Sequence, residues 1–170
     1  MHLKLSRLNH SIKATHFRAY DTELDDIRSI LMDACRLLEH HVIFVVSGFG
    51  QDRWPVDTGT DLPVFLEQLP HVLKAVKNSE AIDIDFYEQG VERLIRLTPC
   101  DTGDHYFLHC TGRLDWVPNP SCSSMDRDRL LEMLCALSDD FMVLITALSP
   151  CIAAHPWVAR WKEVSSTPRP

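Results

Sequence analysis

The sequence contains no apolar run that approaches the roughly 20 residues needed to span a membrane as a helix. Basic residues occur near the start, at Lys4, Arg7 and Lys13, but no apolar stretch follows them, so we expect no secretory signal. The six cysteines include no Cys-x-x-Cys pair, and we therefore expect reduced thiols in a cytoplasmic protein. Internal repeats and low-complexity tracts are also missing.

Motifs that define a chemistry are missing as well. There is no Gly-x-Ser-x-Gly elbow, no phosphate-binding loop and no dinucleotide fingerprint. Two Asp-Thr-Gly tripeptides, at 57–59 and 101–103, match the triplet of aspartic proteases, whose chemistry needs two carboxylates sharing a proton. In that family Ser or Ala follows the triplet, whereas Thr60 and Asp104 follow here, so we interpret both tripeptides as turns.

Metal and nucleophile signatures are weak. His105 and His109 share one face of a predicted strand, but their Cα atoms are about 13 Å apart, too far to share a metal. A Cys–His pair that meets only in space stays open, and no particular cysteine is indicated. We therefore expect no catalytic residue, no metal and no cofactor.

Charge is distributed unevenly along the chain. Residues 1–20 contain four basic side chains and no acidic one, and Arg169 adds a fifth basic side chain. Because the whole chain has a net charge of −7, residues 21–165 carry −12. A body this acidic repels phosphate backbones and anionic lipid and attracts basic partners, so we expect a protein partner and neither nucleic acid nor a membrane. Solubility alone is the alternative explanation.

The stretch from Ala81 to Thr111 predicts an antiparallel meander. Apolar and polar residues alternate with the period of two that a one-sided sheet needs, over strands at 81–87, 91–98 and 105–111. A two-residue turn at Gln89-Gly90 pairs Ile84 with Ile95 and Asp83 with Arg96, whereas a one-residue slip scatters the apolar set.

The remaining elements complete an α+β plan. The apolar, mostly β-branched run at 42–47 is typical of a strand buried on both faces, and hence central in the sheet. Apolar residues at helical spacing predict helices at 22–39, 61–77, 124–148 and 156–163. Pro70 removes one hydrogen bond of the second helix and should kink or split it. We expect one domain over residues 1–170, with an antiparallel sheet of about four strands and helices packed mainly on one face.

The two ends of the sequence have their own character. Segment 1–20 is basic and free of acids, as in a transit peptide, but Leu3, Leu5 and Leu8 favour a short edge strand. We expect flexibility in this segment and in the tail at 165–170.

Two tryptophan-containing loops form the candidate working surface. One follows the strand at 42–47 and the other follows the last meander strand, and both leave the sheet at the same end if these strands run parallel. Tryptophan and arginine are favoured in binding hot spots, and the polar face of the meander adds two carboxylates. The candidate partner-binding residues are Asp52, Arg53, Trp54, Asp57, Asp83, Asp85, Asp115 and Trp116. Alternatively, each tryptophan folds back onto the core.

In size, acidity and α+β architecture the chain resembles the immunity proteins of bacterial toxin systems. These proteins bind a cognate toxin, often a basic nuclease, and cover its active site. The resemblance implies a binding protein without catalysis and assigns no individual residue. The alternative is a small enzyme or ligand-binding protein with a pocket at the Trp54/Trp116 end. Homodimerisation through the Trp157/Trp161 helix is a third possibility.

Overall fold

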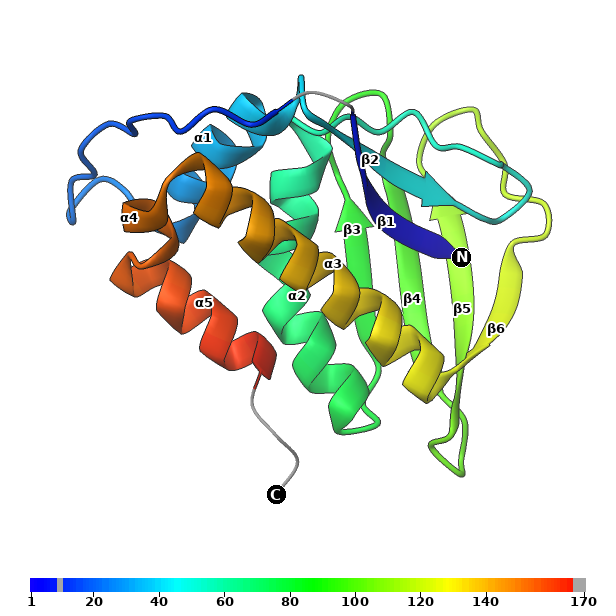
Figure 1. The fold of residues 1–170 in the computed structure, drawn as a ribbon. Coiled ribbons are helices and arrows are strands. Elements are labelled where there is room, and N and C mark those ends of the chain that lie inside the picture. Colours follow the sequence, from blue (N-terminus) through cyan, green and yellow to red (C-terminus); the bar gives the residue numbers. More distant parts are fainter. Residues whose placement is uncertain (9–10, 167–170) are drawn as a thin grey trace.

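Six strands and five helices occur in the described residues, 1–8 and 11–166, of this computed structural model (Figure 1). The strands are β1 (His2–Arg7), β2 (Val42–Ser47), β3 (Ile82–Phe86), β4 (Arg93–Pro99), β5 (His105–Gly112) and β6 (Cys122–Asp126). The helices are α1 (Ile27–Leu38), α2 (Asp61–Lys77), α3 (Arg127–Leu148), α4 (Pro150–Ala153) and α5 (Pro156–Ser166). All pairings are antiparallel, which confirms the α+β class. Residues 167–170 of the predicted flexible tail lie outside the described range.

The meander is the main sheet, in the order β3-β4-β5-β6. Ile84 pairs with Ile95 and Asp83 with Arg96, which confirms the predicted register. The turn uses Gly90 at a φ of +95°, a conformation that glycine adopts without strain. Figure 1 shows α2 and α3 lying across one face of this sheet, and the apolar residues of β3, β4 and β5 on that face are buried in the hydrophobic cluster.

Strand β6 was not predicted, and its presence shortens the long helix. Residues 122–126 pair with β5 instead of opening a helix at 124. Helix α3 begins at Arg127 because the Asp126 side chain accepts hydrogen bonds from the backbone N–H groups of Asp128 and Arg129. Ser123 and Ser124 therefore belong to the sheet.

The prediction that residues 42–47 lie centrally in the main sheet is wrong. Among the described strands β2 pairs with β1 alone, in a separate two-stranded sheet. The loop after β2 occupies its other edge: Thr58 Oγ1 accepts from the Phe44 N–H at 3.0 Å and donates to the Val42 carbonyl at 2.9 Å. The Trp54 N–H donates to the Val46 carbonyl at 2.8 Å. These bonds satisfy the backbone groups that a third strand would otherwise pair.

The N-terminal part of the chain is tied to the fold at several points. β1 is the edge strand that Leu3 and Leu5 predicted, with both leucines buried. Further on, Arg18 binds Asp25 and Asp33 at 2.6 and 3.1 Å. Helix α1 begins after Asp26, whose side chain accepts from the Arg28 N–H, so the helix starts later than the predicted residue 22.

Pro70 neither splits nor ends α2, which runs unbroken from Asp61 to Lys77. A proline at position 70 lacks the N–H that would bond to the carbonyl of Leu66 one turn earlier. The indole N–H of Trp161, on α5, donates to that same carbonyl at 2.8 Å. The tertiary contact therefore supplies the hydrogen bond that the helix cannot make for itself.

Buried side chains form one hydrophobic cluster that extends from Leu3 to Trp161 and includes residues of both sheets and all five described helices. The six cysteines lie within the described residues and are free thiols. Among the helices of the described residues, none has the length and apolar content that a membrane crossing requires.

Candidate functional site

Two tryptophans from different loops close one end of the molecule around an arginine. The ring centroids of Trp54 and Trp116 lie 5.8 Å apart in an edge-to-face arrangement. The guanidinium carbon of Arg93, at the start of β4, lies 4.4 Å from the Trp54 centroid and 3.6 Å from the Trp116 centroid. Trp54 and Arg93 are almost completely buried, at 1% and 3% exposed. The tryptophans therefore meet, as the first interpretation required, while Trp54 also folds back onto the core.

Arg93 is a buried cation, and no carboxylate of the described residues forms an ion pair with it. Its Nη1 donates to Gln51 Oε1 at 2.7 Å, and its Nε has no hydrogen-bond partner among the described residues. Burial lowers the pKa of the guanidinium. Burial also raises the pKa of the neighbouring Cys110 thiol to about 11, so that thiol stays neutral and provides no counterion. The two indole faces are therefore the main electrostatic partners of Arg93.

The loops that carry the tryptophans lie side by side, as Figure 1 shows after β2 and after β5. The Asn119 N–H donates to the Phe49 carbonyl at 3.1 Å, and the Arg113 N–H donates to the Glu92 carbonyl at 2.9 Å. We call the surface formed by residues 51–53, 87–92 and 113–118 the loop end. Within it, Arg93 occupies the space between the indoles, where the alternative hypothesis placed a ligand.

Three of the predicted residues, Asp52, Arg53 and Asp115, are exposed at the loop end. Asp57 is exposed elsewhere, at the start of α2, where it accepts from the Thr60 N–H at 2.7 Å. The carboxylates of Asp57 and Glu39 flank Gly59. The eight candidate residues therefore do not form one contiguous site.

The side of the β3–β6 sheet that faces away from the helices is called the outer face. Arg96 binds both carboxylate oxygens of Asp83 at 2.9 Å and thereby lowers the pKa of Asp83. Arg113 binds Asp85 at 2.8 Å. Both predicted acids of this face are therefore paired with arginines, which reduces the negative charge that they present to a partner.

Four large apolar side chains are exposed on the outer face and the loop end. They are Tyr87, Phe107, Leu114 and Val117, with exposed fractions of 50%, 57%, 49% and 76%. Phe107 lies on the outer face between Thr98 of β4 and Ser124 of β6. Apolar groups gathered on one surface are typical of an interaction site, whereas scattered ones need no explanation.

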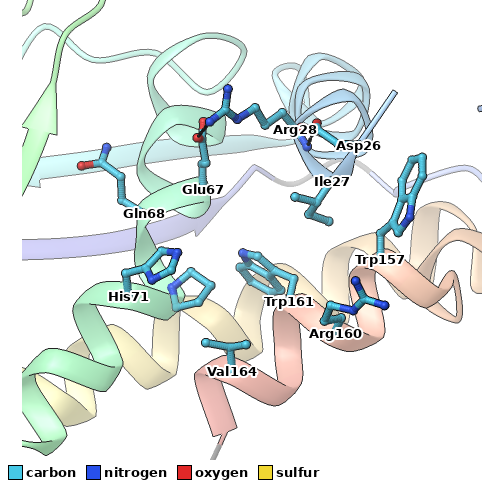
Figure 2. A pocket seen from close by; sticks show the side chains of 11 residues that line it. Asp26, Ile27, Arg28, Glu67, Gln68, His71, Trp157, Arg160, Trp161 and Val164 are labelled. Carbon is cyan, nitrogen blue, oxygen red and sulfur yellow. Dashed lines mark hydrogen bonds and ion pairs between the residues drawn. The ribbon is translucent and has the colours of Figure 1, made fainter. Parts of the chain in front are cut away.

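A groove lies between α1, α2 and α5, and sequence analysis did not predict it. Figure 2 shows its lining side chains, with Ile27 and Trp161 pointing into it and Trp157 beside Arg160 at one margin. Its volume is about 520 Å³. Trp157 is held there by edge-to-face contacts with Tyr20 and His155, at centroid distances of 6.3 and 4.8 Å.

The polar groups of the groove are of two kinds. Arg28 and Glu67 form an ion pair at 2.5 Å, drawn as a dashed line in Figure 2. Gln68 is fixed by two hydrogen bonds to the backbone of Asp85. His71 and Arg160 are exposed and make no hydrogen bond or ion pair with the described residues. These two side chains are the ones free to bind a ligand.

Arg93 is the main residue of the tryptophan cluster that sequence analysis missed. The alternation of the strand could have revealed it. Side chains two residues apart share a face of β4, so Arg93 lies on the same face as the apolar residues Ile95 and Leu97. A charged residue at that position has to be covered by aromatic or polar groups. The groove had no comparable signal, because its lining comes from three helices distant in sequence.

Comparison of the chain with protein-family models, with curated proteins and with solved structures finds no match in any of the three.

Proposed function

We propose that the chain is a protein-binding module that neutralises a basic partner, in the manner of the immunity proteins of bacterial toxin systems. The observation that carries this proposal is the exposure of three large apolar side chains at the loop end, Tyr87, Leu114 and Val117, with Phe107 exposed farther along the outer face. A protein interface needs such an apolar centre within a polar rim.

The charge of the chain supports a basic partner. Residues 21–165 have a net charge of −12, and the five basic side chains outside this range bring the whole chain to −7. At the loop end, Asp52 and Asp115 are exposed beside the apolar side chains. Long-range attraction from this charge would raise the association rate with a basic protein and would weaken as salt is added.

The test uses the polypeptide encoded beside this chain in its genome. We expect that polypeptide to arrest growth when expressed alone, and co-expression of this chain to restore growth through a complex isolated by gel filtration. A neighbouring polypeptide that is harmless, or that forms no complex with this chain, overturns the proposal.

Two valines allow a matched test of the surface. Val117→Ala at the loop end should weaken the complex about tenfold, the effect of losing about 1.4 kcal/mol of apolar contact. Val143→Ala is the control, because Val143 is also exposed, at 54%, but lies on α3. Equal losses for both variants, measured by titration calorimetry, would place the interface elsewhere.

The groove supports a second candidate function, binding of a small aromatic carboxylate. Its volume of about 520 Å³ falls within the range of ligand pockets, and Trp157 and Trp161 offer faces for a ring. The Arg160 guanidinium would attract a carboxylate, and the His71 ring would offer it a further hydrogen-bonding group.

Indole-3-carboxylate is a suitable probe for this candidate. Saturable perturbation of backbone amide NMR signals in α1, α2 and α5, weakened at least tenfold by Arg160→Gln, is the expected result. Arg36→Gln, an exposed arginine on α1 outside the groove, is the control. Shifts that stay linear to millimolar probe would eliminate this candidate.

A further inference from the structure

The turn that joins β4 to β5 brings three different metal-ligating side chains together. Cys100, Asp104 and His105 each place one donor atom within 4.8 Å of the other two. This turn lies at the opposite end of the sheet from the loop end, because β4 runs from Arg93 at the loop end to Pro99. The group therefore lies away from the loop end, at the margin of the outer face, where His105 precedes Phe107 by two residues on the exposed side of β5.

Backbone hydrogen bonds fix the shape of the turn. The Cys100 N–H donates to the His105 carbonyl and the Gly103 N–H donates to the Cys100 carbonyl, both at 2.9 Å. Gly103 has a φ of +73°, which glycine adopts without strain. The Arg127 N–H donates to the Asp104 carbonyl at 2.8 Å and ties the turn to the start of α3. The backbone that carries the three donors is thus held by the fold.

The spacing of the donor atoms suits a tetrahedral ion. Asp104 Oδ1 lies 3.1 Å from Cys100 Sγ and 3.1 Å from His105 Nδ1. Ligands at the usual zinc distances, with tetrahedral angles, are separated by about 3.3–3.6 Å. Opening these two contacts by a few tenths of an ångström gives the zinc spacing, and the Cys100 and His105 donors lie within 4.8 Å of each other.

Neighbouring groups favour the ligand forms of these side chains. The backbone N–H of His105 donates to Cys100 Sγ at 3.3 Å, and the Thr102 hydroxyl lies 3.1 Å from the same sulfur. Thr102 also donates to Asp104 Oδ1 and thereby orients that carboxylate. A hydroxyl that orients a ligating carboxylate is a common outer partner in metal sites.

We propose that Cys100, Asp104 and His105 bind a divalent transition-metal ion of the zinc type. The thiolate and the imidazole favour such an ion over Ca²⁺ or Mg²⁺, which prefer oxygen ligands alone. On binding, the sulfur–metal bond forms as the thiol releases one proton to solvent. Asp104 is exposed, so the fourth position is open to water.

Cobalt is the probe, because a thiolate bound to Co²⁺ gives a near-ultraviolet charge-transfer band. The whole chain, reduced and stripped with a chelator, is titrated with Co²⁺. We expect this band to saturate at one ion per chain and to disappear when Zn²⁺ displaces the cobalt. A wild-type chain that shows no such band in excess Co²⁺ overturns the proposal without any variant.

Variants identify the ligands. Cys100→Ser should abolish the band, and Asp104→Asn and His105→Gln should each weaken binding about 10- to 100-fold. Cys122→Ser is the matched control, because Cys122 is an exposed thiol on β6 that is not part of the group. A band that survives Cys100→Ser and disappears in Cys122→Ser would assign the cobalt to the wrong thiol and refute the site. Circular dichroism confirms that each variant is folded.

Discussion

The guanidinium carbon of Arg93 lies 3.6 Å from the ring centroid of Trp116, closer than its 4.4 Å approach to Trp54. A planar cation thus fills a place at the end of the core that an apolar side chain would ordinarily take. Burying a charge without a carboxylate beside it is costly, and the faces of two indoles offset part of that cost.

Arg93→Lys should destabilise the chain by about 1–2 kcal/mol. An ammonium group is compact and strongly hydrated, and it cannot stack as a plane between two rings. Urea unfolding followed by tryptophan fluorescence measures the effect. Arg96→Lys on the exposed outer face is the control and should change stability by less than about 0.5 kcal/mol, as is usual for surface ion pairs. Similar losses in both variants would mean that stacking contributes nothing.

Thr58→Val should cost about 2 kcal/mol, although the side chain keeps its shape. The hydroxyl of Thr58 bonds to the Phe44 N–H and the Val42 carbonyl along the edge of β2. Losing it leaves a buried donor and a buried acceptor unsatisfied. Thr111→Val, at an exposed position on β5, is the matched control, and thermal unfolding measures both variants. Equal melting temperatures for the two variants would show that the Thr58 hydroxyl does not stabilise the edge of β2.

The free energy of unfolding should fall as the pH rises from about 4 to about 6, because Asp61 loses its proton in this range. Burial raises the pKa of this carboxyl from 3.8 to about 6, so the folded state binds its proton more tightly than the unfolded state does. Stability due to this proton is complete below pH 4 and is lost as the pH passes through 6. A shift of this size corresponds to about 2–3 kcal/mol.

Asp61→Asn tests that expectation. The amide oxygen can still accept from the Asp57 N–H, as the carboxylate does at 2.7 Å, but it carries no charge. The variant should therefore be more stable than the wild type at pH 7, and the difference should vanish near pH 4. Asp140→Asn, exposed on α3, is the control. A difference that is independent of pH would contradict the assignment to Asp61.

Trp161→Phe should cost about 1–2 kcal/mol in the wild type and less in a Pro70→Ala background. The indole N–H satisfies the Leu66 carbonyl at 2.8 Å, and phenylalanine cannot. Alanine at position 70 restores the helical N–H that bonds to the same carbonyl. A double-mutant cycle by urea unfolding measures this coupling. Strictly additive effects would show that the indole N–H does not substitute for the missing helical bond.

Much of the main sheet could be predicted because its information is local. The alternation of Ile82 and Ile84 with aspartates, together with Gly90, determined the register of β3 and β4 correctly. Strand β6 could not be found in this way. Its residues alternate between exposed and half-buried, and none is fully buried, so it is a strand because β5 offers an unpaired edge.

The working surfaces were harder to predict than the strands. Trp54 was placed near Trp116 on the condition that strand 42–47 runs parallel to β5 in the main sheet; the two rings do meet, although β2 pairs with β1 in a separate sheet. The cation between them depended on which face of β4 Arg93 occupies. The apolar run at 42–47 was placed in the wrong sheet, because a hydroxyl at Thr58 can satisfy an edge as a neighbouring strand does. The pattern of apolar residues does not reveal that a side-chain hydroxyl takes the place of a neighbouring strand.

The bond between Trp161 and Leu66 has a consequence for the order in which the chain is made. The acceptor on α2 is synthesised 95 residues before its donor. Helix α2 therefore leaves the ribosome with an open carbonyl at its proline, and it acquires its full set of backbone bonds only when α5 docks. The chain has to be translated through α5 before its second helix is complete.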